Sequence, residues 1–134
     1  MPTDLYPWLV LDMGESQAVR RVQIFNRAGC CGDELTDVEV RISDTKPTSA
    51  EEHFTEGSLL GNYDGWASTG QMITMEKSES SMGRYVVVQH NSKGVIKWVD
   101  GHWKPANKDK GGAGLLDIAE VKVFGGKLHY QLYQ

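Results

Sequence analysis

The 134 residues suit one compact domain, and 14 Lys and Arg against 18 Asp and Glu give a net charge of −4. This balance excludes a dedicated nucleic-acid binder, which normally carries a basic face, and no apolar run approaches the roughly 20 residues of a transmembrane segment. The first residues lack both a basic segment and a continuous apolar core, so we expect no signal peptide in this chain.

Stretches in which apolar and polar residues alternate recur along the chain, with Gly and Asn between them. This alternation predicts strands, in chain order, at residues 8–12, 18–26, 35–43, 71–75, 84–89, 95–99 and 115–124. In the clearest one, Val38, Val40 and Ile42 alternate with charged residues, which is typical of a half-buried antiparallel strand. Only Thr48 and Glu51, which have the spacing of a capping box, indicate a short helix. The pattern predicts an all-β fold, an antiparallel β-sandwich or jelly roll.

Residues 90–114 carry five lysines and two aspartates, a local charge of +3 that leaves −7 for the rest of the chain. The same segment contains Trp98, His102 and Trp103. One interpretation is a long, solvated surface loop with a short strand at 95–99. The other is a binding loop, in which aromatic faces and ammonium groups contact a sugar or an anion.

The chain has two cysteines, Cys30 and Cys31, and they are adjacent. They cannot join distant segments, and without spaced Cys or His partners they do not favour a metal site. Two interpretations remain open: two reduced thiols, or a strained vicinal disulfide whose rigid edge presents sulfur to a ligand. The oxidised form would imply an oxidising compartment.

Catalytic motifs are missing from the sequence. The four histidines are scattered, and neither an H-E-x-x-H helix nor a G-x-S-x-G turn occurs. The Gly-rich residues 111–114 lead into a predicted strand rather than a helix, which argues against a phosphate-binding loop. We therefore expect no enzymatic activity.

Several of these segments together resemble the F-type lectin (fucolectin) domain. The residues that carry the resemblance are Pro7–Gly14, Val22–Gly32 with its Asn-Arg-x-x-Cys-Cys core, Leu35–Ile42, Gly83–Val86 and Ile118–Val123. The resemblance covers about residues 7–125 and extends to the discoidin and coagulation-factor type C modules. It implies an eight-stranded, galactose-binding-domain-like sandwich, non-enzymatic sugar binding and an extracellular or secreted location. It also implies that Cys30 and Cys31 form the vicinal disulfide that packs against bound fucose in that family.

The sugar motif of that family is an upstream His, then Arg-x-Asp, then a second basic residue. Arg27 matches the first Arg, but Gly29 stands in place of the Asp and Glu34 in place of the second cation. The upstream His belongs to a segment that precedes Pro7 in the family. Each lost charged hydrogen bond costs roughly 1.5–3 kcal/mol, so we expect weak or absent binding of fucose. Arg27 could also pair with Glu34 and be structural.

The calcium site of the family is matched only by Glu120. Because calcium takes six to eight oxygen ligands, Glu120 alone cannot form the site. We expect no cofactor, with Ca²⁺ bound through Glu120 as the alternative.

After the sandwich, residues 127–134 again alternate apolar and polar side chains behind Gly125 and Gly126. The sequence predicts one domain, 1–134, with this extension as a strand that completes the sheet in its own subunit. It could also exchange into a second copy and form a homo-oligomer, and a frayed tail is the alternative.

These observations favour a lectin-like recognition or adhesion module for a glycan or glycoprotein. Its ligand-binding residues would be Arg27, Cys30, Cys31, Glu34, Trp98, His102 and Trp103. The alternatives are a protein-interaction module, or a binder of anionic phospholipid or sulfated glycan that uses the lysines of 93–110.

Overall fold

The computed structural model describes residues 8–26, 36–49, 52–68, 70–90, 96–99, 102–105, 118–125 and 128–133. The regular elements in these ranges are all strands, and they contain no helix that could cross a membrane. In chain order they are β1 (Trp8–Asn26), β2 (Thr36–Ser43), β3 (Ser58–Trp66), β4 (Met72–His90), β5 (Ile96–Val99), β6 (His102–Pro105), β7 (Ile118–Phe124) and β8 (Leu128–Tyr133).

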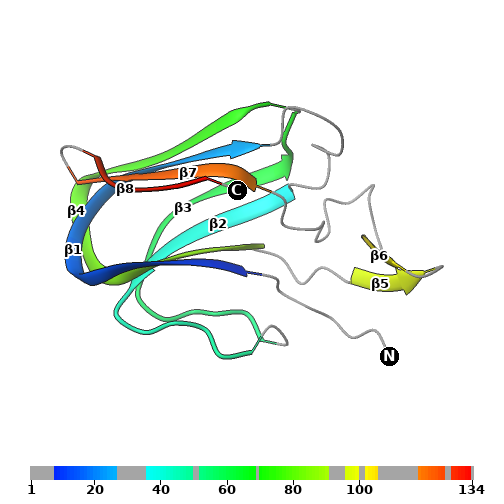
Figure 1. The fold of residues 1–134 in the computed structure, drawn as a ribbon, viewed down its shortest axis with the longest axis horizontal. Coiled ribbons are helices and arrows are strands. Elements are labelled where there is room, and N and C mark those ends of the chain that lie inside the picture. The colour runs from blue at the N-terminus through cyan, green and yellow to red at the C-terminus, as the bar shows by residue number, and fades with distance from the viewer. Residues whose placement is uncertain are drawn as a thin grey trace.

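Six of the strands form one antiparallel sheet in the order β3-β2-β4-β1-β7-β8, while β5 and β6 form a separate hairpin. The long strands β1 and β4 pair with each other from Trp8–Gln89 to Phe25–Met72. Register breaks after Asp12 and Val19 mark the region where both strands bend and the sheet folds over itself (Figure 1). Register breaks let a strand curve more strongly than a regular ladder permits.

The bend divides the sheet into two layers that share β1 and β4. The first layer contains β3, β2, the C-terminal half of β4 and the N-terminal half of β1. The second contains the N-terminal half of β4, the C-terminal half of β1, β7 and β8. A Cβ added to Gly61 of β3 would lie 3.1 Å from the Met75 side chain of β4, so the layers contact each other here.

Apolar side chains from both layers fill the space between them. Val38, Val40 and Ile42 of β2 are fully buried, as their alternation predicts, and so are Val22 and Ile24 of β1. Burial stabilises the fold by roughly 1.5–3 kcal/mol for each such side chain. The prediction of an all-β antiparallel sandwich is confirmed.

In two places, strands that the sequence predicts as separate are joined into one long strand. The strands predicted at 8–12 and 18–26 are continuous in β1, and those at 71–75 and 84–89 are continuous in β4. Polar and Gly-rich residues such as Gly14 suggested a turn, but they occupy the bend instead. Gly83 lies at this bend in β4, where a Cβ would come within 2.7 Å of the Ser43 backbone nitrogen.

The outer face of the first layer is also covered, which corrects the prediction of a half-buried β2. Asp37 and Glu39 are 8% and 2% exposed. Residues 44–49 and 52–57, which we call the strap, run from β2 to β3 beneath this face (Figure 1). The helical turn predicted from Thr48 is absent at Thr48 and Ser49, while Glu51 lies outside the described residues.

Candidate functional site

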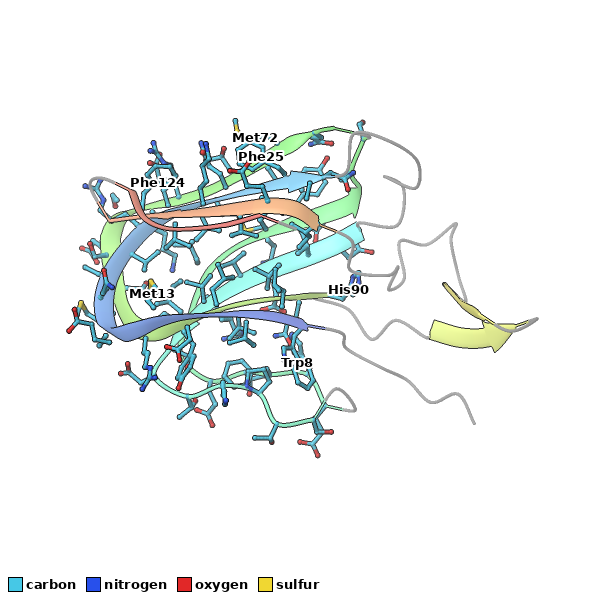
Figure 2. The ribbon with its side chains drawn as sticks, in the orientation of Figure 1. Trp8, Met13, Phe25, Met72, His90 and Phe124 are labelled. Atoms are coloured by element: carbon cyan, nitrogen blue, oxygen red, sulfur yellow. The ribbon has the colours of Figure 1, made fainter. Side chains whose placement is uncertain are left out.

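The strand ends that flank the predicted binding residues gather at one end of the sandwich. Asn26 at the end of β1 pairs with Ile118 at the start of β7, and His90 at the end of β4 pairs with Val38 near the start of β2. These termini lie together on the right of Figure 1, and His90 marks the position in Figure 2. We call this region the loop end. Residues 27–35 and 91–117, which contain the predicted ligand-binding residues, both connect strands that terminate there.

Asn26 fixes the upstream side of the 27–35 segment. It is 3% exposed, and its side-chain Nδ2 donates to the Ser68 carbonyl at 2.8 Å, while its backbone N–H donates to the Gln71 carbonyl at 2.9 Å. Gln71 Nε2 in turn donates to the Tyr63 hydroxyl at 3.0 Å. Because buried polar groups are costly to leave without partners, this network holds the end of β1 in one position.

Asp37 fixes the downstream side of the same segment. Its φ of 46° lies in the left-handed region, and its Oδ1 accepts the Gly65 N–H at 2.7 Å. A non-glycine residue in this region carries backbone strain, which the surrounding contacts must offset. The hydrogen bond ties the start of β2 to the end of β3. Both flanks of the 27–35 segment are therefore positioned by the sandwich itself.

Sequence reasoning did not select Asn26 or Asp37 as site residues. Asn26 had a signal, since it opens the Asn-Arg-x-x-Cys-Cys segment, but its partner Ser68 is distant in the chain. The sequence contains no pattern that would have identified Asp37, because a charged residue in an alternating strand indicates a solvent-facing position.

The predicted residues Arg27, Cys30, Cys31 and Glu34 lie outside the described residues. The other three belong to the β5–β6 hairpin, whose backbone is described. Trp98 and Trp103 are direct register partners, and His102 pairs with Val99. The hairpin therefore brings the two tryptophan positions opposite each other within the segment that starts and finishes at the loop end.

Glu120, the predicted metal ligand, lies on β7 opposite Phe25 of β1. Its Oε2 is 3.9 Å from Lys122 Nζ, and Lys122 Nζ is 5.4 Å from the centre of the Phe25 ring. Phe25 and Phe124 lie along the outer side of the second layer in Figure 2. Among the described residues, no group of three or more His, Cys, Asp or Glu side chains could hold a metal ion.

Known proteins resemble the chain in sequence and in fold. Residues 2–88 match the family described as NedA-like, galactose-binding domain. The chain is 28% identical over 81 residues to the fucolectin of Anguilla anguilla, covering 60% of this chain and 48% of that protein. The structure of an F-lectin (fucolectin) from Morone saxatilis serum superposes with a TM-score of 0.62 at 25% identity, covering 93% of this chain and 34% of the other.

A fucose binding module of Streptococcus pneumoniae shares the fold, with a TM-score of 0.53 at 20% identity over 88% of this chain and 62% of the module. The chain thus spans less than two thirds of the length of each of these relatives. The family match extends over more than half of the chain and confirms the resemblance found in the sequence. The chain belongs to the NedA-like galactose-binding domain family, and it has the fold of the F-type lectins.

Proposed function

We propose that the chain is a non-enzymatic, lectin-like module that binds a glycan or glycoprotein outside the cell. The observation that supports this most is the gathering of the strands that flank 27–35 and 91–117 at the loop end, on flanks fixed by Asn26 and Asp37. Loops held by a rigid scaffold are a common place for binding residues. The relatives are named as fucolectins and as a fucose binding module, which supports a sugar as the class of ligand.

Arg27 is the proposed cationic donor to sugar oxygens, and Glu34 is an acceptor in the same segment. Trp98, His102 and Trp103 would add aromatic and polar contacts from the β5–β6 hairpin. An acceptor-only carboxylate at position 34 suits a sugar hydroxyl that donates. It does not suit a fucose that is held by two cations, so we expect the preferred glycan to differ from free L-fucose.

Binding to a glycan array, followed by calorimetry with the best ligand, tests this proposal. Arg27→Leu should weaken binding about tenfold or more, because each charged hydrogen bond contributes roughly 1.5–3 kcal/mol. Arg20→Leu is the matched control, since Arg20 is exposed near the bend of β1 and should leave binding unchanged. The double variant Gly29→Asp, Glu34→Arg should bind L-fucose more tightly than the parent chain.

Other results would overturn parts of the proposal. Micromolar affinity of the parent chain for L-fucose would contradict the predicted preference. If the chain binds no glycan on the array but binds anionic vesicles, and if that binding weakens as salt is added, then its ligand is an anionic surface rather than a glycan. Glycan binding should also persist in EDTA, since Glu120 lies next to Lys122 and is the one residue of this sequence that matches the calcium ligands of the family.

Cys30 and Cys31 are proposed to be joined as a vicinal disulfide beside the bound sugar. The support is their place in the Asn-Arg-x-x-Cys-Cys segment of a chain that belongs to this family. Intact mass measured after alkylation, with and without prior reduction, tests it in protein purified under oxidising conditions. Two alkyl groups should be added only after reduction, and labelling of both thiols without reductant would contradict the disulfide.

A further inference from the structure

The strap forms an open hollow of about 330 Å³ on the flank of the sandwich. Thr45, Lys46, Pro47, Thr48, Ser49, Glu52, His53, Phe54, Thr55 and Glu56 line it. The strap runs beneath the outer face of the first layer, whereas the predicted ligand-binding residues belong to segments that begin and finish at the loop end (Figure 1). Its volume lies at the lower limit of the range found for small-molecule sites, which fits a single small ligand.

Buried polar residues of the sheet hold the strap in place. Gln89 is 1% exposed, and its side-chain amide contacts both backbone groups of Phe54: Nε2 donates to the carbonyl at 2.7 Å, and Oε1 accepts the N–H at 3.2 Å. This double hydrogen bond to a main-chain segment resembles the pairing of a β-strand. It fixes the hollow before any ligand arrives, which lowers the entropic cost of binding.

Glu39 anchors the strap at a second point. Its carboxylate contacts Arg41 Nε at 2.9 Å through Oε2 and His53 Nε2 through Oε1. Arg41 Nη1 then donates to the Thr55 carbonyl at 3.2 Å. The strap returns to the sheet at Gly57, whose φ of 76° and close approach to the Ile42 carbonyl favour glycine. The wall residues on either side of Phe54 are therefore held by the sheet.

The lining residues include four with hydroxyl groups and three with charged side chains. Thr45, Thr48, Ser49 and Thr55 line the hollow and carry hydroxyls, of which Thr45 Oγ1 already shares a hydrogen bond with Ser43 Oγ at 3.1 Å. A hydroxyl can both donate and accept, which suits the donors and acceptors of a polyhydroxylated ligand. The charged residues of the lining are two carboxylates, Glu52 and Glu56, and one ammonium, Lys46. This excess of negative charge disfavours sulfated, phosphorylated or carboxylated ligands. Phe54 is partly buried and also lines the hollow, and an aromatic ring can contact the C–H face of a sugar ring.

We propose that this hollow is a second saccharide subsite, which takes one neutral sugar residue. The inference rests on the proposed glycan-binding function for the class of ligand, and it adds a place separate from the loop end. A glycan that reaches both surfaces, or two branches of one glycan, would then gain affinity by bivalent attachment.

The test is a titration of the ¹⁵N-labelled full chain with neutral methyl glycosides of galactose, glucose, N-acetylglucosamine and fucose, followed by amide chemical shifts. A bound sugar should shift the amides of Lys46, Thr48, Glu52 and Thr55. Thr48→Val combined with Glu52→Ala should weaken this binding roughly tenfold, since the hydroxyl of Thr48 and the carboxylate of Glu52 are both removed and two hydrogen bonds are lost. Thr74→Val, an exposed threonine on β4 in the second layer, is the matched control and should leave it unchanged.

Each contrary outcome has its own meaning. Shifts confined to residues 27–35 and 96–105 would overturn the second subsite and leave the proposed function supported. If a sugar changes the amide chemical shifts of the strap equally in the parent chain and in the double variant, the subsite would also be overturned. Shifts in neither region would count against the proposed function as well. Galactose 6-sulfate that binds the strap as well as methyl galactoside would contradict the neutral ligand class.

Discussion

Asp12 and Arg84 form a bidentate ion pair between β1 and β4. Arg84 Nε lies 2.7 Å from Asp12 Oδ1, and Arg84 Nη2 lies 2.9 Å from Oδ2. The hydrogen bonds from Arg84, and then the one from the Gly14 N–H, lower the pKa of Asp12 below its ordinary value of 3.8. Both side chains are exposed, so water and salt screen the attraction and the pair adds little stability.

Asp12→Asn should therefore give a small, pH-dependent loss of stability. A carboxylate whose pKa is lower in the folded state stabilises the fold above its unfolded pKa, and this stabilisation is lost as the pH falls through the folded pKa. We expect the variant to melt slightly below the parent chain at pH 7, and the gap to close below about pH 4. Thermal melts in low salt between neutral and acidic pH measure this.

The control for this experiment is Glu79→Gln, which removes a different exposed carboxylate, one that lies on β4. It should not reproduce the pH-dependent gap. A gap for Asp12→Asn that stays constant down to the lowest pH would mean that the loss comes from packing rather than from the charge of Asp12.

Glu39 shows how far single positions could be predicted from the sequence. Alternation correctly placed Val38 and Val40 in the core, because the period of two fixes which side chains share a face. It also placed Glu39 on the opposite face, but it carried no information on what covers that face. The burial of Glu39 depends on the strap, and on His53 in particular, which no local pattern connects to β2.

At the scale of elements, the strands missed by the sequence pattern are those that depend on their neighbours. β3 contains Gly61 and Gly65 together with Asn and Asp, residues that disfavour strands. It nevertheless pairs with β2 from Thr36–Trp66 to Ile42–Ser58. β6 ends in Pro105, which lacks the N–H of a strand, yet β5 pairs with it throughout. Pairing with neighbouring strands therefore stabilises β3 and β6, although both contain residues with a low propensity for strands.

β8 offers an element-scale test of the C-terminal extension. It pairs antiparallel with β7 from Glu120–Tyr133 to Phe124–Leu128, and it forms one edge of the sheet. Removing residues 127–134 would leave β7 as an edge with unpaired backbone groups. We expect a loss of about 2 kcal/mol, which lowers the Tm by roughly 6–10 °C in a domain of this size.

Differential scanning calorimetry of the truncated chain measures this change, and removal of Gln134 alone is the control. Size-exclusion chromatography of the same samples shows whether the exposed edge then drives association. A truncated chain with the Tm of the parent would mean that β8 does not contribute to the stability of the sheet.

At the scale of the whole molecule, the candidate site depends on topology rather than on any single motif. The sequence could single out Arg27 and Trp98, because both stand in segments of unusual composition. It could not show that the two segments attach at one end, because that follows from the antiparallel pairing of β1 with β7 and of β2 with β4. The sequence could not predict the hollow formed by the strap either, since Gln89 and Phe54, whose hydrogen bonds hold the strap, are distant in sequence.

The shared strands β1 and β4 also have a consequence for how the chain is made. Trp8 at the start of β1 pairs with Gln89, and Arg21 pairs with both Glu76 and Phe124. A ribosome therefore releases β1 long before the strands that flank it, and Val22 and Ile24 have no core to enter until then. Strands that are so distant along the chain pair slowly, and until then β1 can form non-native contacts. Of the two strands that join the layers, β1 thus stays without its partner β7 until the C-terminal part of the chain has been made.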